Sequence, residues 1–533
     1  MGESDPRDER EIMEVLLKNR EIEDAEGFFN PPDPKEILAD LPRFIPDLNL
    51  KDLKRAVSRI KKAVRGREKI IVWGDYDVDG ISATAILWRV LWDLGADVRP
   101  YIPDRFEEGY GLNKEGIGAL KEKGVSLIVT VDSGITAKEA VDHAASLGVD
   151  MIISDHHLKP RALPKAHAIV HTTRLCGTGV AWILASQLAS PVKVQKELDL
   201  VAIATIADLQ PVLGANRALM KRGFEVLNRL ERPGLAALAE VSRLKRGALS
   251  SYAAGWVLGP RINAVGRMGQ GIEALRLLCT PKPTRARELA HILGKANQER
   301  KDVTEEIVED ARRKVNKKGL IVVYEDGWHE GVIGLVASKL VGEFARPAVV
   351  ISKGDGFSKG SARSVNGLNI VEILKKYDRY LEDLGGHEAA AGFTIKSENL
   401  EPFVKALSSG TEELISRLDP RPVLKIDARL PLDKLTYEIV RELEKFEPTG
   451  LGNAAPLFLA EGAKVISTRM VGKDSQHLIL RFAPGFEAIW FGAAGEEEFS
   501  RGETISFVYS PEIRTYRGKE SLSLRIEDLR RFK

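Results

Sequence analysis

The chain has 533 residues, too many for one hydrophobic core, so about three or four domains are expected. Apolar residues make up 44% and charged residues 29%, which is ordinary for a soluble globular protein. The formal net charge of +2 lacks the strong basic excess of many nucleic-acid-binding chains, although it leaves room for a local basic channel.

The first half of the chain changes pattern near residue 67. Residues 1–66 read as an N-terminal helical and linker segment, with apolar residues at helical spacing over 50–64. Strands and helices then alternate to about residue 215, and the pattern is mostly helical from there to 280. Such alternation predicts a parallel sheet with right-handed crossovers, the first through a helix at 81–94. We therefore assign 67–283 to a first α/β domain.

The second half contains a long polar helix and two further domains. Residues 284–318 are helix-compatible throughout, as expected of a helix that connects two domains. A second α/β domain is expected over 319–412, opening with a strand at 320–324. From 421 to 533 the pattern turns to short strands with glycine turns, which favours a barrel of the oligonucleotide-binding (OB) type. Its strands are expected at 477–482, 504–509 and 522–526.

Cysteine content and the N-terminus bear on the compartment. Two cysteines, Cys176 and Cys279, cannot build a disulfide framework or a zinc site alone, and they favour a reduced setting. The N-terminus lacks the apolar core of a signal peptide, and no apolar run reaches the length of about 18 residues needed to span a membrane. We expect a cytoplasmic location.

Acidic residues follow several apolar runs of the first α/β domain. Strand-like runs at 70–74, 127–131 and 151–154 end in acids or histidines, and a further acid closes the run 201–207, which we group with these strand ends. Carboxyl ends of parallel strands face the crevice where open α/β sheets hold ligands. Crowded carboxylates would repel one another strongly unless cations lay among them. The residues concerned are Asp75, Asp77, Asp79, Asp132, Asp155, His156, His157 and Asp208.

The ligand types favour a pair of hard cations. Carboxylates with one or two imidazoles suit Mn²⁺ or Mg²⁺ better than zinc. Asp132 stands alone at its strand end and could bridge two ions about 3.5–4 Å apart, which would together activate water for phosphoryl transfer. A calcium loop counted from Asp75 would need Glu at its twelfth position, where Ile86 stands. Taken singly, Asp132 or Asp208 could equally be an ordinary capping residue.

Together these motifs resemble a known superfamily. The stretches 75–80, 131–134, 155–157 and 207–208 are similar to the signature of the DHH phosphoesterases. Within that superfamily, 259–267, 328–334, 360–364 and 385–392 resemble the RecJ family of single-strand-specific 5′→3′ DNA exonucleases. The resemblance implies hydrolysis of single-stranded DNA to mononucleotides in repair and recombination, with two Mn²⁺ or Mg²⁺ ions as cofactors.

The same resemblance implies roles for individual residues. It implies Asp75, Asp77, Asp79, Asp132, His156 and Asp208 as metal ligands. Asp132 would bridge the ions, Asp155 would orient an imidazole, and His157 would contact the scissile phosphate or leaving group. For DNA contact, arginines suit phosphates, aromatic rings suit bases, and glycine-rich backbone can approach the strand, as 385–387 would. The expected DNA-binding residues are Arg105, Tyr110, Arg261, Arg267, Arg363, Ser364, Gly385, Gly386, His387, Tyr516 and Arg517.

Alternatives remain at this point. Smaller relatives in the superfamily act on short oligoribonucleotides or cyclic dinucleotides, but they generally lack the long helix and the terminal barrel. An inert relative works in the eukaryotic replicative helicase, but such proteins lose metal ligands. The loop 171–179 is shorter than in the family, so His171 could replace its usual Asn. Expected partners are single-stranded DNA and, less directly, a helicase or single-strand-binding protein, with the chain acting as a monomer.

Overall fold

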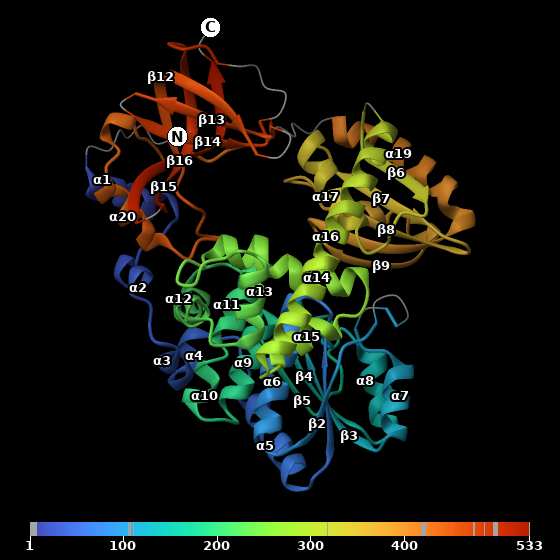
Figure 1. The fold of residues 1–533 in the computed structure, drawn as a ribbon. Coiled ribbons are helices and arrows are strands. Elements are labelled where there is room, and N and C mark those ends of the chain that lie inside the picture. The colour runs from blue at the N-terminus through green and yellow to red at the C-terminus, as the bar shows by residue number, and fades with distance from the viewer. Residues whose placement is uncertain are drawn as a thin grey trace.

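The computed structural model describes residues 8–104, 108–109, 111–316, 318–416, 423–472, 475–483, 485–493, 499–516 and 518–531. Figure 1 shows three bodies, with a β-barrel and a second α/β unit both lying on one side of a first α/β unit. Within the described ranges, no helix is both long enough and apolar enough to cross a bilayer.

The first α/β unit is built on a five-stranded parallel sheet of order β2-β1-β3-β4-β5. Helices cover both faces, which is why the inner strands are largely apolar and buried, whereas the edge strand β2 carries exposed Asp97 and Arg99. The strand order reverses direction at β1, between β2 and β3, and such a switch point opens a ligand crevice at the carboxyl ends of the strands. The strands are β1 (Lys69–Gly74), β2 (Asp97–Tyr101), β3 (Val125–Val131), β4 (Asp150–Asp155) and β5 (Ala168–His171).

Two helical layers enclose this sheet. One core packs the sheet against α5 (Leu50–Arg65), α6 (Val78–Asp93) and α9 (Gly177–Ser186). The other packs it against α7 (Lys114–Glu122) and α8 (Lys138–Ser146). Helix α6 starts three residues earlier than the sequence indicates, because the Asp77 side chain accepts the N–H of Gly80 and so caps the helix.

The apolar run before Asp208 forms a helix and no strand. Residues 201–207 belong to α11 (Leu198–Ala207), whose side chains are buried nearly all round. Periodicity cannot separate a buried strand from a helix buried on every side, so grouping Asp208 with the strand ends was wrong. The neighbouring helices are α10 (Pro191–Gln195), α12 (Gly214–Arg229), α13 (Pro233–Val241), the π-helix η1 (Ala253–Leu258), α14 (Gly259–Met268) and α15 (Ile272–Cys279).

Helix α16 (Pro283–Lys314) runs from the first α/β unit to the second, where the sequence predicts a connecting helix. The second sheet has the order β6-β7-β8-β10-β9, with β6 and β7 parallel and the other pairs antiparallel. Its strands are β6 (Ile321–Asp326), β7 (Ala348–Lys353), β8 (Phe357–Arg363), β9 (Leu381–His387) and β10 (Ala390–Lys396). Its helices are α17 (Ile333–Phe344), α18 (Ile370–Lys375) and α19 (Leu400–Ser416).

The C-terminal strands close into a barrel. Strand β12 pairs with β13 on one side and with β15 on the other, so the ring β12-β13-β14-β16-β15 has no free edge. This confirms the OB-like barrel and the expected fold class. The strands are β12 (Phe458–Val471), β13 (His477–Phe482), β14 (Phe486–Phe491), β15 (Thr504–Tyr516) and β16 (Lys519–Arg531), preceded by β11 (Ala428–Arg429) and α20 (Tyr437–Leu443).

The N-terminal segment contributes to two different cores. Helices α1 (Glu9–Asn19) and α2 (Ala25–Phe29) pack against the barrel, where Ile12, Leu16 and Phe28 join its apolar core. Arg20 fixes this contact through an ion pair of 2.8 Å with Asp427. Helices α3 (Pro34–Ala39), α4 (Leu41–Phe44) and α5 instead join the core of the first α/β unit.

One buried arginine joins the barrel to the first α/β unit. Arg217 on α12 donates hydrogen bonds to the backbone carbonyls of Phe28, Lys445, Phe446, Glu447 and Pro448, over 2.7–3.2 Å. Its guanidinium carbon also lies 3.7 Å from the centre of the Phe28 ring. Burial lowers the pKa of Arg217 to about 10. The planar guanidinium suits this role because its five N–H donors have a fixed geometry.

Candidate metal centre

Carboxylates and imidazoles from separate elements meet at the carboxyl end of the first sheet. Nε2 of His156, just after β4, lies 3.1 Å from Oδ1 of Asp132, just after β3. The same nitrogen lies 3.6 Å from Oδ2 of Asp79 and 3.7 Å from Oδ2 of Asp208. The end of helix α11 therefore brings Asp208 to the place for which the sequence suggests a strand.

The possible ligand atoms form three overlapping groups, each within a span of 4.8 Å. The first contains Asp75, Asp77 and Asp132. The second contains Asp79, His156 and Asp208, and the third joins Asp132 to both histidines, His156 and His157. Asp132 thus belongs to one group on the β1 side and to another on the β4 side, which is the position a bridging ligand would need.

Asp79 is held by the start of helix α9. Its two carboxylate oxygens accept the N–H groups of Gly177 and Thr178 at 2.6 and 2.7 Å, and its carbonyl accepts the Thr178 hydroxyl at 2.8 Å. Helix N-termini favour negative charge, so α9 stabilises this buried carboxylate. Gly177 must lack a side chain, because a Cβ there would lie 2.5 Å from Oδ1 of Asp132.

The backbone of Asp132 adopts an unusual conformation. Its φ of 60° lies in the left-handed region, which costs free energy for a residue other than glycine. The N–H of Asp132 donates to the Ser154 carbonyl of β4 at 2.9 Å, and this bond helps to hold the turn. The strain turns the Asp132 carboxylate toward His156, and only 2% of the residue is exposed.

Asp155 orients His157. One oxygen of Asp155 lies 2.8 Å from Nδ1 of His157 and also accepts the backbone N–H groups of His156 and His157. Its other oxygen accepts the N–H of Ile135 at 2.9 Å. Burial opposes both charges, but the Asp155–His157 contact outweighs it, lowering the pKa of Asp155 and raising the pKa of His157 to about 9.

Burial also shifts the pKa of three carboxyl groups and of His156. Burial, together with the neighbouring carboxylates, raises the pKa of Asp132 well above its usual value and raises that of Asp208 to about 8. Burial and Asp79 likewise raise the pKa of Asp77, while burial lowers that of His156. Oδ1 of Asp132 and Nε2 of His156 are buried 3.1 Å apart, yet neither forms a hydrogen bond within the described part of the chain. A hard divalent cation fits both observations, since it would stabilise the charges and use the unpaired ligand atoms.

The structure adds Gln210, which the sequence does not single out, and shows what Asn263 of the 259–267 motif contacts. The Gln210 amide nitrogen lies 2.9 Å from Oδ2 of Asp208 and 3.4 Å from Nδ1 of His156. Asn263 accepts the N–H of Val78 at 2.7 Å and thereby fixes the turn that carries Asp77 and Asp79. Gln210 lies two residues after the proposed ligand Asp208, and this spacing was the only, weak indication in the sequence that Gln210 belongs to the site.

His171 of the shortened loop also has a defined contact. Its Nε2 lies 2.7 Å from the backbone carbonyl of His157. It therefore supports the segment that carries both histidines.

The expected DNA-binding residues are only partly brought together. Arg267 donates to the Gly331 carbonyl at 3.2 Å, and Nη2 of Arg363 lies 2.9 Å from the position of a Cβ on Gly334. Gly331 and Gly334 flank the start of α17, so both arginines lie where the two α/β units meet. Ser364 donates to the Leu368 carbonyl at 2.6 Å.

Two further sets of expected DNA-binding residues have defined positions. Half-buried Arg261 donates to the Val257 carbonyl at 2.8 Å, a contact within its own helical segment. Residues 385–387 lie on the exposed edge strand β9, paired with β10, and Gly386 has a φ of 144°. Glycines are permitted in both a tight loop and an irregular edge strand, so sequence alone does not separate the two. Arg105, Tyr110, Arg517 and the side chain of Tyr516 lie outside the described residues.

A parallel sheet whose carboxyl end gathers buried carboxylates and imidazoles in this way defines a metal-dependent phosphoesterase. Family models match three stretches of the chain: the DHH family N-terminal domain over 69–205, the DHHA1 domain over 316–413 and the RecJ OB domain over 426–528.

Individual relatives agree with these family models. The chain is 37% identical over 504 residues to the single-stranded-DNA-specific exonuclease RecJ of Bacillus subtilis, covering 91% of this chain but 64% of that protein. It is 31% identical to RecJ of Salmonella typhimurium, covering 93% of each. The Mn²⁺ complex of RecJ from Thermus thermophilus has a TM-score of 0.84 at 29% identity, covering 98% of this chain and 76% of that one.

The chain therefore belongs to the RecJ family of single-strand-specific DNA exonucleases. This confirms the expected family, the enzyme class and a divalent cation as the cofactor. A Mg²⁺ complex of the Thermus protein, with a TM-score of 0.78, shows that this relative also accepts the second expected ion.

Proposed function

We propose that this protein removes mononucleotides from the 5′ end of single-stranded DNA during repair and recombination. The observation that carries the proposal is the set of three ligand groups, of which one contains both Asp132 and His156 and so overlaps with each of the other two. Two Mn²⁺ or Mg²⁺ ions bound there would supply an activated water and neutralise the phosphate charge that builds up in the transition state. Domain boundaries near 67–283, 284–318, 319–412 and 421–533 would divide catalysis from DNA handling.

The ligand groups suggest how the residues divide between two ions. Asp75 and Asp77 would serve one ion, and Asp79, His156 and Asp208 the other, with Asp132 between them. The overlap of the groups at Asp132 supports its bridging role. Asp79 is anchored by two N–H donors of α9, so its position is set before any ion binds.

His157 and Asp155 would assist the departing oxygen. A pKa of about 9 keeps the His157 imidazole protonated near neutral pH, while Asp155 holds its Nδ1. The opposite ring nitrogen can then donate a hydrogen bond to the scissile phosphate or to the 3′ oxygen that leaves. Asp155 is the positioning residue in this pair, because its oxygens are used by His157 and by backbone N–H groups.

Recognition of the 5′ phosphate would fall to the junction of the two α/β units. Arg267 and Arg363 both meet the first turn of α17, whose N-cap residue, Val332, supplies no side-chain cap. Guanidinium groups beside the free N–H groups of a helix N-terminus favour a phosphate. A strand gripped there by its end would be cut from the 5′ side.

The path of the strand would continue over exposed aromatic side chains and the barrel. Tyr252 and Trp256 on or beside η1 are 61% and 75% exposed. Gly255 between them lies against Ile206 of α11, two residues before Asp208. Exposed rings next to a nuclease centre suit base stacking, and an OB barrel provides a groove for single strands.

We further propose that the enzyme acts in the cytoplasm as a monomer. A helicase or a single-strand-binding protein would supply its substrate. The family relationship supports this setting, because a nuclease that is specific for single strands needs another protein to open or present the duplex.

The decisive experiment uses 50-nucleotide strands labelled at either end, in single-stranded and duplex form, with Mn²⁺ or with a chelator. We expect Mn²⁺-dependent release of labelled mononucleotide from the 5′-labelled single strand. With the 3′ label, progressively shorter fragments are expected. Release of labelled mononucleotide from the 3′ end would overturn the polarity, and preference for a dinucleotide would move the enzyme to another substrate class.

A further inference from the structure

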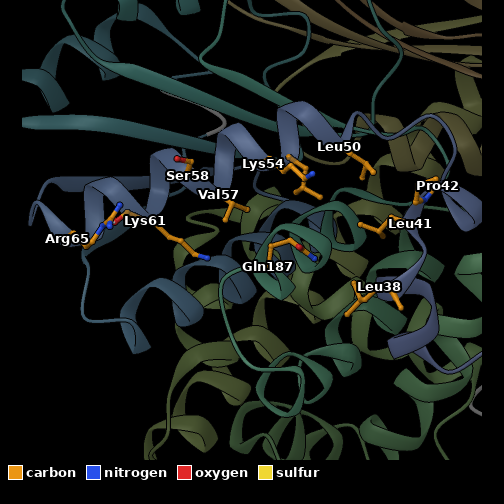
Figure 2. A pocket seen from close by; sticks show the side chains of 12 residues that line it. Leu38, Leu41, Pro42, Leu50, Lys54, Val57, Ser58, Lys61, Arg65 and Gln187 are labelled. Carbon is orange, nitrogen blue, oxygen red and sulfur yellow. The ribbon is translucent and has the colours of Figure 1, made fainter.

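A pocket of about 440 Å³ opens between the N-terminal helices on the surface of the first α/β unit. Figure 2 shows side chains of α5 and of the segment 38–42 pointing toward one space, with Gln187 between them. Its apolar lining comes from Leu38, Ala39, Leu41, Pro42, Leu50, Leu53 and Val57. A volume of this size accommodates a small ligand or one or two bulky side chains.

The charge around this pocket has one sign. Lys54, Lys61 and Arg65 line it from one face of α5, and all three are exposed. Within the part of the chain that the structure describes, none of these three cations forms an ion pair. Among the described residues, those that line the pocket include no Asp or Glu. An occupant must therefore bring its own negative charge if these cations are to be paired.

Nearby acidic residues are already used for capping. Glu36 accepts the N–H of Asp33 at the start of α3, and Asp40 accepts the N–H of Arg43 at the start of α4. Asp52 pairs with Arg55 and with Asn49 at the start of α5. These carboxylates stabilise the starts of the helices that shape the pocket, and they do not pair with Lys54 or Lys61.

The pocket is separate from the metal centre. Gln187 is the residue that ends α9, whereas the first residues of α9, Gly177 and Thr178, bind Asp79. A ten-residue helix is about 15 Å long, so the two sites lie at opposite ends of α9. A molecule in the pocket would leave the path of the DNA strand open.

We propose that this pocket binds an acidic peptide segment of a partner protein, with a bulky apolar side chain seated on Leu41, Leu53 and Val57. Carboxylates on either side of that side chain would pair with Lys54, Lys61 and Arg65. The aliphatic lining argues against a nucleotide, because no aromatic ring is present for a base to stack on. The concave shape argues against a membrane surface, which is bound by protruding apolar side chains.

The test uses fluorescence anisotropy with the full-length protein and a labelled eight-residue peptide in which Asp and Glu flank two Leu. One comparison peptide replaces the acids by Lys, and another replaces both Leu by Ser. Lys54→Glu/Lys61→Glu reverses the charge at the pocket. Lys51→Glu/Lys62→Glu makes the same change on α5 at positions that do not line it. Ala39→Trp fills the apolar part from an exposed position.

We expect the acidic peptide to lose at least ten-fold in affinity with Lys54→Glu/Lys61→Glu and with Ala39→Trp, and less than three-fold with Lys51→Glu/Lys62→Glu. Both comparison peptides should bind at least ten-fold more weakly than the acidic one. Nuclease activity on a free single strand should be unchanged in all three variants. Equal peptide binding by all variants, or no binding by the native protein, would overturn the proposal. So would displacement of the peptide by vesicles of phosphatidylglycerol or by oligo(dT) at lower concentration.

Discussion

Acidic residues lie at both ends of helix α11, fully buried at its start and partly buried at its end, and the two ends differ in what balances the charge. At its start, Glu197 and Asp199 lie 2.8 Å from the guanidinium of Arg232, and all three side chains are buried. At its end, Oδ2 of Asp208 lies 3.7 Å from Nε2 of His156, and the same nitrogen lies 3.6 Å from Oδ2 of Asp79. The first group is neutralised within the chain, whereas the charges that act on Asp132 in the second are mainly those of other carboxylates.

This difference separates a structural cluster from a metal centre more sharply than burial does. Both groups lie in the same apolar core, so desolvation alone would treat them alike. Burial opposes the charge of Arg232, yet its two carboxylate partners raise its pKa. Around Asp132 the neighbouring carboxylates instead raise its pKa, so that its charged form is disfavoured. Divalent cations would supply the positive charge that balances the carboxylates around Asp132.

Replacing Asp132 gives the largest expected effect. Asp132→Asn removes the charge but keeps a residue type that tolerates a positive φ, so the turn should persist. We expect at least about a thousand-fold loss of activity, or about 4 kcal/mol of transition-state stabilisation. Release of mononucleotides from a 5′-labelled strand measures it. The control Asp97→Asn changes an exposed acid at the opposite end of the sheet and should be silent. Retained turnover in Asp132→Asn would refute the bridging role.

Replacing Arg232 should lower the stability of the fold and leave the nuclease activity nearly unchanged. Arg232→Met leaves Asp199 buried without its counter-charge and Glu197 with only Arg89, at 3.7 Å, which costs about 3–5 kcal/mol of unfolding free energy. Chemical denaturation measures this loss. Activity at low temperature, where the variant is still folded, should stay within a few-fold of the native value. A stable but inactive Arg232→Met would contradict the division into structural and catalytic clusters.

Most of the candidate metal centre could be predicted because its chemistry is local in sequence. Asp75, Asp77 and Asp79 directly follow one strand, and parallel pairing brings the ends of β3 and β4 beside it. Pairing of this kind needs only strand periodicity to be recognised. The meeting of these acidic residues at one edge of the sheet therefore followed from runs of residues, whereas the helical setting of Asp208 did not.

Contacts between distant segments could not be predicted in this way. Helix α1 has the amphipathic pattern of any surface helix, and nothing in it identifies the barrel, more than 400 residues away, as its partner. Arg217 resembles other exposed helix cations in sequence, yet it is buried against five carbonyl groups. The placement of residues 385–387 on an edge strand depends likewise on pairing with β10.

Two exposed tryptophans, Trp256 and Trp92, differ in their distance along the fold from the metal centre. Trp256 lies on η1 beside the end of α11 that carries Asp208, and Trp92 lies in the last turn of α6, at the far end from Asp79. Stacking on a base is worth about 1–3 kcal/mol, so Trp256→Ala should weaken oligo(dT) binding about five-fold or more. Trp92→Ala, 60% exposed in the native protein, should bind normally. Equal effects of both substitutions, seen by fluorescence quenching, would remove Trp256 from the path of the strand.

The metal-free protein should lose stability as pH rises from 7 to 9. The folded-state pKa of Asp208 is about 8, above its ordinary value near 4, so the stability it contributes is present at low pH and is lost as it deprotonates. His157, with a pKa of about 9, acts in the same direction, because its charged form is the one that Asp155 stabilises.

Thermal denaturation in a chelator should therefore show a melting temperature that falls by a few degrees over this range. Mn²⁺ should remove most of the decline, since a bound cation favours the deprotonated carboxylates. Asp208→Asn should show a shallower decline without metal, and Asp97→Asn the native one. A melting temperature that rises with pH in the chelator would mean that the chain neutralises these carboxylates itself, as it does at the other end of α11.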